Sequence, residues 1–202
     1  MKDMAAIAAF ALAVLGFTAV VDSGVWLTFA MMALYATLLA QSWNLLGGFG
    51  GQFSFGHALF FGCGAYVQAI AQVTHGINPW LALVLAVAVA VAVGLFVGAL
   101  SLRTRGIYFI MVTLAFAQMA YFVFHDTGVG GGSDGIYLYA RPRLGPIDLE
   151  QRLQLFYLVL AALVGTYALL ATIRGSRFGA ALAGIRVNEQ RMRAAGFATY
   201  GY

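Results

Sequence analysis

The polar residues between Gln41 and Tyr66 have the types and spacing best suited to chemistry, because they interrupt long apolar runs. This segment reads QSWNLLGGFGGQFSFGHALFFGCGAY and carries Asn44, Gln52, Ser54 and His57 around a cluster of glycines. Lipid tails offer such groups no hydrogen-bond partner, so at membrane depth they are tolerated only against protein or a water-filled path. We therefore expect these four side chains to line a translocation path.

Structural interpretations of the same residues remain open at this stage. Asn44 and Gln52 bracket the glycines and could satisfy backbone groups at a break between two helices. His57 could cap or bond the glycine-rich backbone nearby. The glycines themselves do not form a Walker A phosphate loop, since the single lysine is Lys2 and no Gly-Lys-Ser/Thr follows them. If ATP drives this protein, another chain must bind it.

No catalytic or metal site is expected. The histidines His57, His75 and His125 are far apart and lack the helical spacing of a metal site. Cys63 is the single cysteine, which excludes an internal disulfide. The apolar runs contain no carboxylate pair and no Ser/Lys dyad. We expect a protein that is not an enzyme and that holds no cofactor.

Composition indicates a membrane protein. The 202 residues are 62% hydrophobic, against about 45–50% in ordinary soluble domains, and the mean hydropathy is +0.88. A helix needs about 20 apolar residues to cross the bilayer. Six runs approach this length, which predicts an all-α polytopic membrane protein with about six transmembrane helices. The runs are Met4 to Val21, Val25 to Leu46, Phe53 to Val73, Pro79 to Leu102, Gly106 to Phe124 and Leu153 to Ile173.

The basic residues predict the orientation, because cytoplasmic loops carry an excess of Lys and Arg. With six spans and the N-terminus in the cytoplasm, the inner segments hold eight basic and two acidic residues and the outer ones three basic and five acidic. The positive charge therefore reflects topology, and no nucleic-acid partner is expected. The inner basic residues are Lys2, Arg103, Arg105, Arg174, Arg177, Arg186, Arg191 and Arg193, and the outer ones are Arg141, Arg143 and Arg152.

Small residues recur every fourth position in two of the runs, which predicts close helix packing, since helices in lipid associate largely by van der Waals contact. Thr113 and Gln118 are expected to form interhelical hydrogen bonds. One small-residue ridge comprises Ala82, Ala86, Ala90, Gly94 and Gly98, and the other comprises Ala58, Gly62, Ala65 and Ala69.

An outer loop from His125 to Arg152 contains Gly132, Ser133, Asp134 and Gly135. These residue types form tight turns. A loop of this length is uncommon without a function. A solvated loop, a docking site for an outside partner and a lid over the path all remain open.

The last part of the chain, 174–202, is basic and polar, and it predicts a cytoplasmic segment outside the membrane domain of residues 1–173. Arg186 to Ala195 is expected to be helical, with Gly196 as its C-cap. Contact with a soluble partner is favoured over a lipid-surface anchor, because bulky apolar residues are scarce. A basic loop of this kind normally connects two spans, so we expect the sequence to be an amino-terminal part of a larger membrane protein, truncated before further transmembrane helices.

Three stretches together resemble the permease subunits of branched-chain amino acid ABC importers, the LivM and LivH family, and most closely the LivM side. The first is SWNLLGGFGGQFSFGHALFFGCGAY. The second is SLRTRGIYFIMVTLAFAQM followed by GGSDG. The third is SRFGAALAGIRVNEQRMRAAGF, which is similar to the cytoplasmic loop that couples such permeases to their ATPases. The resemblance covers about Gln41 to Tyr202.

This resemblance implies a permease subunit that translocates branched-chain, hydrophobic amino acids across the bacterial plasma (inner) membrane. The implied partners are a second, LivH-like permease, two cytoplasmic ATP-binding subunits and an outer substrate-binding protein, in addition to the lipid bilayer. Coupling to the ATPase would involve Arg186, Glu189, Arg193 and Gly196.

The apolar interiors of the spans lack charged residues, which independently favours an external energy source over proton coupling. A permease for urea or a short amide, and a self-contained secondary carrier or channel, remain alternatives.

Overall fold

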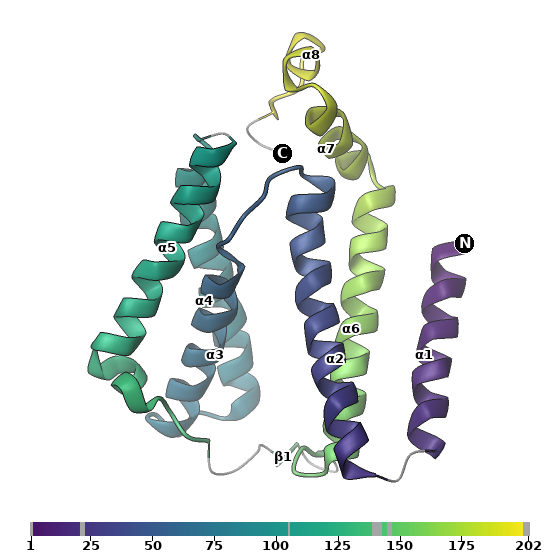
Figure 1. Cartoon of the computed structure of the whole chain (residues 1–202), viewed down its shortest axis with the longest axis vertical. Helices are drawn as coiled ribbons and strands as arrows, with labels where there is room; N and C mark the ends of the chain where they lie inside the picture. The colour runs from purple at the N-terminus through teal and green to yellow at the C-terminus, as the bar shows by residue number, and fades with distance from the viewer. Residues whose placement is uncertain (1, 21–22, 105, 139–142, 145–146, 200–202) are drawn as a thin grey trace. The chain divides into compact units, whose positions relative to one another are not determined.

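The computed structural model describes residues 2–20, 23–104, 106–138, 143–144 and 147–199 (Figure 1). The chain divides into two compact units. The first unit contains Met1–Gly51 and Arg141–Tyr202, and the second contains Gln52–Ala140. The Gln41 to Tyr66 segment therefore contributes residues to both units. The first span was predicted to end at Val21 and the cytoplasmic segment at Tyr202, and both residues lie outside the described part of the chain.

The first unit is built from helices and one short hairpin. We call α7 and α8 together the charged segment, because they carry Arg177, Arg186, Glu189, Arg191 and Arg193. The elements are α1 (Lys2–Val20), α2 (Gly24–Trp43), the π-helix η1 (Asn44–Phe49), strands β1 (Arg143–Leu144) and β2 (Ile147–Asp148), α6 (Arg152–Gly175), α7 (Arg177–Val187) and α8 (Glu189–Ala194).

The second unit is a group of three helices followed by two single turns. α4 begins at Pro79, whose missing N–H costs nothing at a helix start, and the Asn78 side chain accepts a hydrogen bond from the Trp80 amide at 3.0 Å. The elements are α3 (His57–Val73), α4 (Pro79–Ser101), α5 (Ile107–Asp126) and the 3-10 turns η2 (Gly128–Gly130) and η3 (Gly132–Asp134).

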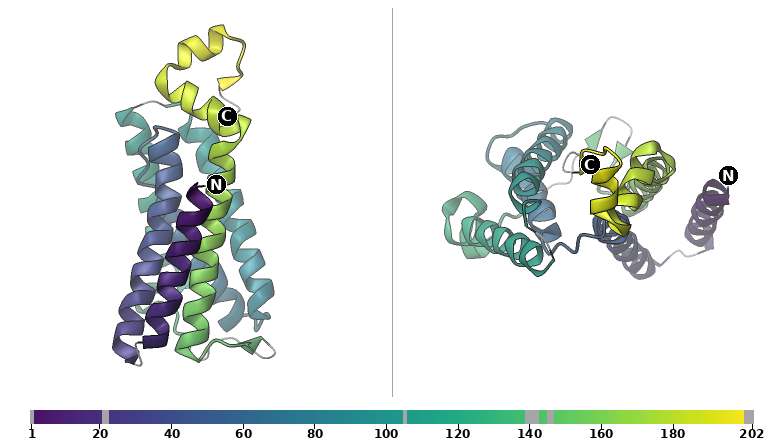
Figure 2. Two further views of the ribbon diagram at one scale, coloured as in Figure 1. Left: turned by 90° about the vertical axis from the view of Figure 1, so that its right-hand side faces the viewer. Right: turned by 90° about the horizontal axis from the view of Figure 1, so that it is seen from above.

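Helices α2 and α6 form the core of the first unit. Large side chains from both helices interlock, with Phe156 fully buried and Leu163 2% exposed. Leu27, Met31 and Leu34 of α2 belong to the same cluster. α6 also contacts α1, and the left view of Figure 2 shows α1 running alongside it. The α2–α6 pair is the element that supports the residues following α2.

The small-residue ridge predicted on α4 is buried at its first two members, whereas the ridge predicted on α3 is buried only at Ala69. On α4, Ala82 and Ala86 are buried. On α3, Ala58 and Ala65 are exposed, and Gly62 lines an apolar groove of about 180 Å³ between α3 and α5. The buried face of α3 instead presents Leu59 and Cys63, which cluster with Val97 of α4. These larger side chains bury more area than the ridge beside them, and a spacing of four does not distinguish neighbouring faces of a helix.

The protein is an all-α polytopic membrane protein, as predicted. Among the described residues, four helices are long and apolar enough to cross a membrane: 24–49, 79–101, 107–126 and 152–175. α3 has 17 residues, which makes it about 26 Å long, somewhat shorter than the hydrocarbon core of about 30 Å. The figure of six spans therefore stays a prediction.

Two predicted helix boundaries differ from the structure. The third run was expected to be helical from Phe53, whereas α3 begins at His57, because the residues before it form a turn. The helix expected from Arg186 to Ala195 is divided at Asn188, whose backbone is extended (φ −158°, ψ 99°). The Asn188 side chain accepts a hydrogen bond from the Arg191 amide at 3.0 Å and so begins a new helix, α8.

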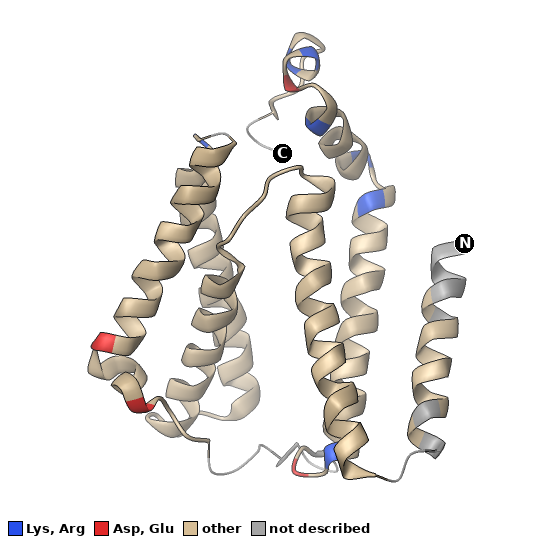
Figure 3. Cartoon of the chain, in the orientation of Figure 1, with Lys and Arg blue, Asp and Glu red and all other residues tan. Residues whose placement is uncertain are grey.

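Charges of opposite sign lie at opposite ends of the second unit (Figure 3). Arg103 follows α4, where α5 begins, whereas Asp126 ends α5 and Asp134 follows it. In the first unit, Arg174 lies in the last turn of α6 and the charged segment follows directly. Each unit by itself therefore has a basic end, formed in the second unit by Arg103 among the described residues.

Candidate functional site

The helix α2 changes geometry at the glycines that follow it. Residues 44–49 form a π-helix, and the Gly50 amide donates to the Leu45 carbonyl at 3.0 Å. We call residues 44–51 the glycine break. Gly51 has a φ of +69°, a conformation that favours glycine. A Cβ on Gly50 would lie 2.7 Å from the Leu46 carbonyl oxygen, so a side chain at this position would force the backbone to shift. Single π turns are rare and occur frequently at functional sites.

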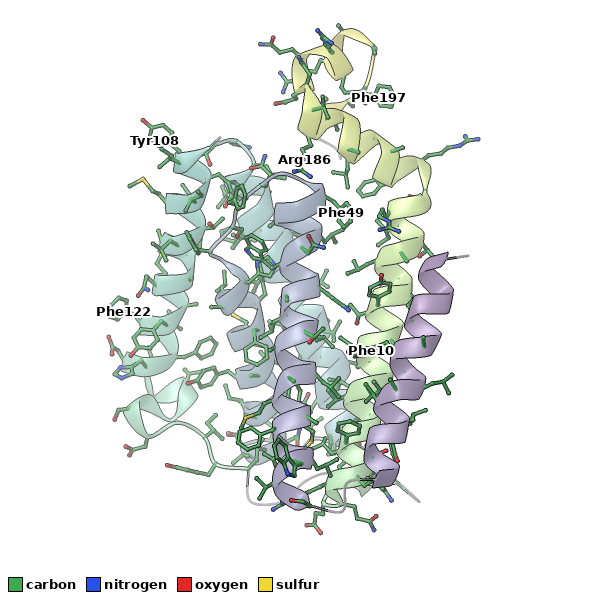
Figure 4. All side chains as sticks on the ribbon, turned by 45° about the vertical axis from the view of Figure 1, so that its right-hand side comes forward. Phe10, Phe49, Tyr108, Phe122, Arg186 and Phe197 are labelled. Carbon is green, nitrogen blue, oxygen red and sulfur yellow. The ribbon has the colours of Figure 1, made fainter. Side chains whose placement is uncertain are left out.

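Arg186 of the charged segment lies against the glycine break. Its Nη1 donates a hydrogen bond to the Gly48 carbonyl. A Cβ on Gly51 would lie 2.8 Å from Arg186 Cγ, so the arginine stem also packs closely on the backbone. Figure 4 shows this side chain extending from α7 toward the end of α2. The end of a candidate membrane span and the predicted coupling region therefore contact each other within one unit.

Asn44 lines a small cavity in the first unit. The cavity has a volume of about 90 Å³ and lies between α2, the glycine break and α6. A neighbouring cavity of about 220 Å³ involves α1, α2 and α6 and shares Gln41 and Tyr167 with it. The smaller cavity is lined by Gln41, Asn44, Phe49, Tyr167, Leu170, Ala171 and Arg174.

Gln41 is a candidate path residue that the sequence reasoning did not select. Its side-chain oxygen is buried, and within the described part of the chain no hydrogen-bond donor reaches it. Gln41 and Asn44 are three residues apart on α2 and its continuation, a spacing that puts two side chains on one helix face. This spacing was the signal in the sequence that could have identified Gln41. The partners from α6, Tyr167 and Arg174, have no such signal.

Ser54 of the second unit lies in a tight turn that is hydrogen-bonded to α5. Its Oγ accepts a hydrogen bond from the Gly56 amide at 3.0 Å, and the side chain is 4% exposed. The next amide, of Phe55, donates to Thr113 Oγ1 at 3.3 Å, and Thr113 donates to the Ile110 carbonyl at 3.0 Å. The Ser54 hydroxyl thus holds the turn before α3 internally, and the Thr113 hydroxyl joins this turn to α5.

Gln52 and His57 lie on either side of this turn. His57 is the first residue of α3, and its ring meets Phe60 edge-on, with 6.3 Å between the ring centroids. Gln52 is half-buried in the segment before the turn. Asn44 belongs to the first unit and the other three residues proposed for the path to the second. The structure brings Ser54 and His57 into one turn, and it groups Asn44 with Gln41.

The charged segment has a defined internal structure. Ser176 Oγ accepts from the Gly179 amide at 3.3 Å and caps the start of α7. α7 and α8 meet closely, since a Cβ on Gly184 would lie 2.8 Å from Met192 Sδ. These contacts hold the two short helices as one body with α6.

The coupling residues of α8 form a small network. Glu189 Oε1 lies 2.6 Å from Arg193 Nη2, one turn along the helix. Thr199 Oγ1 donates to Glu189 at 3.3 Å and accepts from Arg193 Nε at 2.9 Å. Gly196 ends the helix with a φ of +90°, and the Phe197 amide donates to the Met192 carbonyl at 3.1 Å. This is a Schellman motif, which confirms the prediction that Gly196 is a C-cap. Arg186 lies outside this network, on α7.

The predicted outer-loop residues form a compact double turn beyond α5. Gly132, Ser133 and Asp134 make the 3-10 turn η3, and Gly132 and Gly135 both have positive φ angles. The adjacent Gly130 is buried, and a Cβ there would lie 2.7 Å from the Phe124 carbonyl oxygen. The glycines therefore allow the loop to fold closely onto the end of α5.

Comparison with known proteins gives one family and two relatives. Residues 25–202 match the family described as branched-chain amino acid transport system, permease component. The high-affinity branched-chain amino acid transport system permease protein LivM of Salmonella typhimurium (strain LT2) is 28% identical over 123 residues. The protein of the same name from Escherichia coli K12 is 27% identical over 123 residues. The matched segment covers 60% of this chain and 29% of each relative. No solved structure matches the chain.

Proposed function

The chain belongs to the family of branched-chain amino acid transport system permease components, and on that premise we propose that it is the translocation subunit of an ABC importer. The main support for this proposal is the family match over residues 25–202, which include the glycine break and the charged segment. In this proposal the chain moves branched-chain, hydrophobic amino acids inward across the bacterial plasma membrane. It is a transport component without an ATPase site of its own.

The proposed energy source is a pair of cytoplasmic ATP-binding subunits. The charged segment suits contact with such a subunit, because it follows α6 at the basic end of the first unit and exposes few bulky apolar side chains. Within it, Glu189 and Arg193 belong to the network on α8, and Gly196 follows the end of that helix; we propose these residues for the contact. We assign residues 1–173 to the membrane domain and 174–202 to the coupling loop. The basic end then faces the cytoplasm, as does the N-terminus.

The residues proposed for the path are considered in each unit by itself. In the first unit, Asn44 and Gln41 line a cavity, which supports a role for them in the path. In the second unit, Gln52, Ser54 and His57 stay path candidates because they are polar residues at or just before the start of α3. A second, LivH-like permease supplies the remaining wall. The double turn with Gly132, Ser133, Asp134 and Gly135 would face outward, where it could meet a substrate-binding protein. Arg103 at the other end of the second unit supports this proposal, because basic residues favour the cytoplasmic side.

Uptake by cells tests the function and the substrate class together. The gene is deleted, and initial uptake of labelled leucine is measured with and without an excess of unlabelled isoleucine, valine or urea. We expect deletion to lower uptake and the two amino acids, but not urea, to compete. Competition by urea alone would replace the substrate class with short amides. Full leucine and urea uptake in the deletion strain would contradict the proposal.

A further inference from the structure

We propose that Arg186 is a positioning residue that joins the charged segment to the glycine break, rather than a residue that contacts the ATP-binding subunit. This inference rests on the proposed function, and it concerns how motion of α7 reaches the end of α2. The two contacting residues, Arg186 and Gly48, are 138 positions apart in the chain. Their contact is therefore a property of the fold that no local pattern reveals.

The first step of the argument is the bond that Arg186 makes. Arg186 is an exposed residue, yet its guanidinium Nη1 donates to the Gly48 carbonyl within its own unit. This donor is therefore directed to the glycine break rather than to a partner subunit. Hydrogen bonds with an ionised donor are about twice as strong as neutral ones. One such bond can hold two elements together where apolar contact is limited.

The second step is the acceptor. The Gly48 carbonyl lies in the π-helical turn, whose backbone bonds run five residues apart, as between the Gly50 amide and the Leu45 carbonyl. Single π turns are rare and occur frequently at functional sites, and the arginine adds a hydrogen bond to this turn from another helix. Movement of the arginine therefore acts directly on the turn.

The third step is the fit around the arginine stem. Gly51 adopts a φ of +69°, and a side chain there would collide with Arg186 Cγ at 2.8 Å. Glycine at this position both allows the turn and leaves room for the arginine. The backbone of the break and the arginine stem are thus shaped to each other, beyond the single hydrogen bond.

The fourth step is the rigidity of the element that carries Arg186. Ser176 caps the start of α7, and its hydroxyl also donates to the Ile173 carbonyl of α6 at 2.6 Å. A Cβ on Gly179 would lie 2.5 Å from the Ile173 and Arg174 carbonyl oxygens, so α7 leaves α6 through a closely packed joint. A displacement of the charged segment is therefore transmitted to the glycine break through Arg186, because no flexible linker separates α7 from α6.

The experiment compares Arg186→Met with Arg177→Met in the full-length protein assembled with its ATP-binding subunits. Both changes remove one positive charge from α7. Arg177 is exposed near the other end of the helix, and no contact of its side chain with the break is present in the described residues. Arg186→Lys restores a charged donor. Two quantities are measured: amide hydrogen exchange of peptides that cover residues 45–51, and substrate molecules transported per ATP hydrolysed.

We expect Arg186→Met to speed exchange in residues 45–51 roughly tenfold, as loss of one charge-assisted bond from a local opening equilibrium would. Transport per ATP should fall roughly tenfold while ATP hydrolysis and complex yield persist. Arg177→Met should match the wild type, and Arg186→Lys should lie between. Loss of assembly in Arg186→Met alone, with normal coupling in Arg186→Lys, would overturn the positioning role.

Other outcomes separate the two proposals. Equal exchange in Arg186→Met and Arg177→Met would overturn the contact itself. Faster exchange with an unchanged ratio of transport to hydrolysis would overturn its role in transmission. A wild-type complex that transports without ATP would contradict the proposed function and the transmission role together, and the exchange data would still decide whether the contact exists.

Discussion

The two halves of the Gln41 to Tyr66 segment are held by different kinds of contact. In the first unit, the long side chain of Arg186 reaches the backbone of the glycine break. In the second unit, the short buried hydroxyls of Ser54 and Thr113 fix the turn before α3. A buried hydroxyl holds one backbone geometry, whereas a long side chain follows the element that carries it. The segment thus joins a half suited to movement with a half suited to staying fixed.

The largest effect is expected from a substitution within the glycine break. Gly50→Ala places a Cβ 2.7 Å from the Leu46 carbonyl oxygen, whereas Gly48→Ala places one 2.0 Å from Asn44 Oδ1. The first obstacle is backbone and the second is the end of a flexible side chain. We expect Gly50→Ala to destabilise by about 2–3 kcal/mol, as overpacking does, and Gly48→Ala by clearly less. Thermal unfolding in detergent measures both, and the reverse order would contradict the account of this turn.

The fixed half is tested by Thr113→Val. The change keeps the shape of the side chain but leaves the Phe55 amide without its acceptor, which costs about 1–3 kcal/mol. Thr172→Val is the matched control, because Thr172 also bonds a carbonyl three residues back, Leu169, but is exposed. The same thermal unfolding measurement applies. Equal stability of the two variants would show that the hydroxyl does not fix the turn.

A smaller effect is expected at the end of the charged segment. Gly196 has a φ of +90°, so Gly196→Ala should cost about 1 kcal/mol. Gly175→Ala is the control, since Gly175 has an ordinary φ and an added Cβ meets nothing within 4 Å. Amide exchange in residues 189–197 reports the change. Protection of these amides that is as high in Gly196→Ala as in Gly175→Ala would argue against the Schellman cap.

The smallest effect on stability is expected from Glu189→Gln. The ion pair with Arg193 is largely exposed, with side chains 55% (Arg193) and 31% (Glu189) accessible, and such pairs contribute about 0.3–0.5 kcal/mol. Under the proposed function the same change weakens association with the ATP-binding subunit. Pull-down of that subunit by Glu189→Gln and by Arg191→Met separates a specific surface from general charge. Equal binding by both variants and the wild type would remove Glu189 from the interface.

Most of the helices were predictable because apolar runs of this length have few alternatives. Pro79 after Asn78 gave the start of α4 to the residue. The start of α3 was placed too early because Ser54 and Phe55 look apolar or neutral in sequence, while their hydrogen bonds to Gly56 and Thr113 stop the helix. Thr113 was expected to form an interhelical hydrogen bond, whereas it accepts one from the Phe55 amide in the turn before α3.

The candidate site was less predictable, because its key contact is long-range. Arg186 was selected for its place in a basic loop, and nothing in that loop indicates the Gly48 carbonyl. The division of the expected Arg186 to Ala195 helix depends on Asn188, a residue type that caps helices but also occurs within them. Gln41 was overlooked because one amide at the end of an apolar run is weak evidence without a cavity beside it.

The central claim is that this chain translocates solute with energy from partner ATPases. The direct measurement is leucine uptake into proteoliposomes that contain the full-length protein, its partner permease and the ATP-binding subunits. The outer binding protein is added outside the vesicles. ATP or a non-hydrolysable analogue is enclosed in the lumen, which the cytoplasmic side of the complex faces. The account predicts uptake with ATP and none with the analogue. Equal uptake under both conditions, or uptake by the permease alone, would contradict it and favour a self-contained carrier or channel.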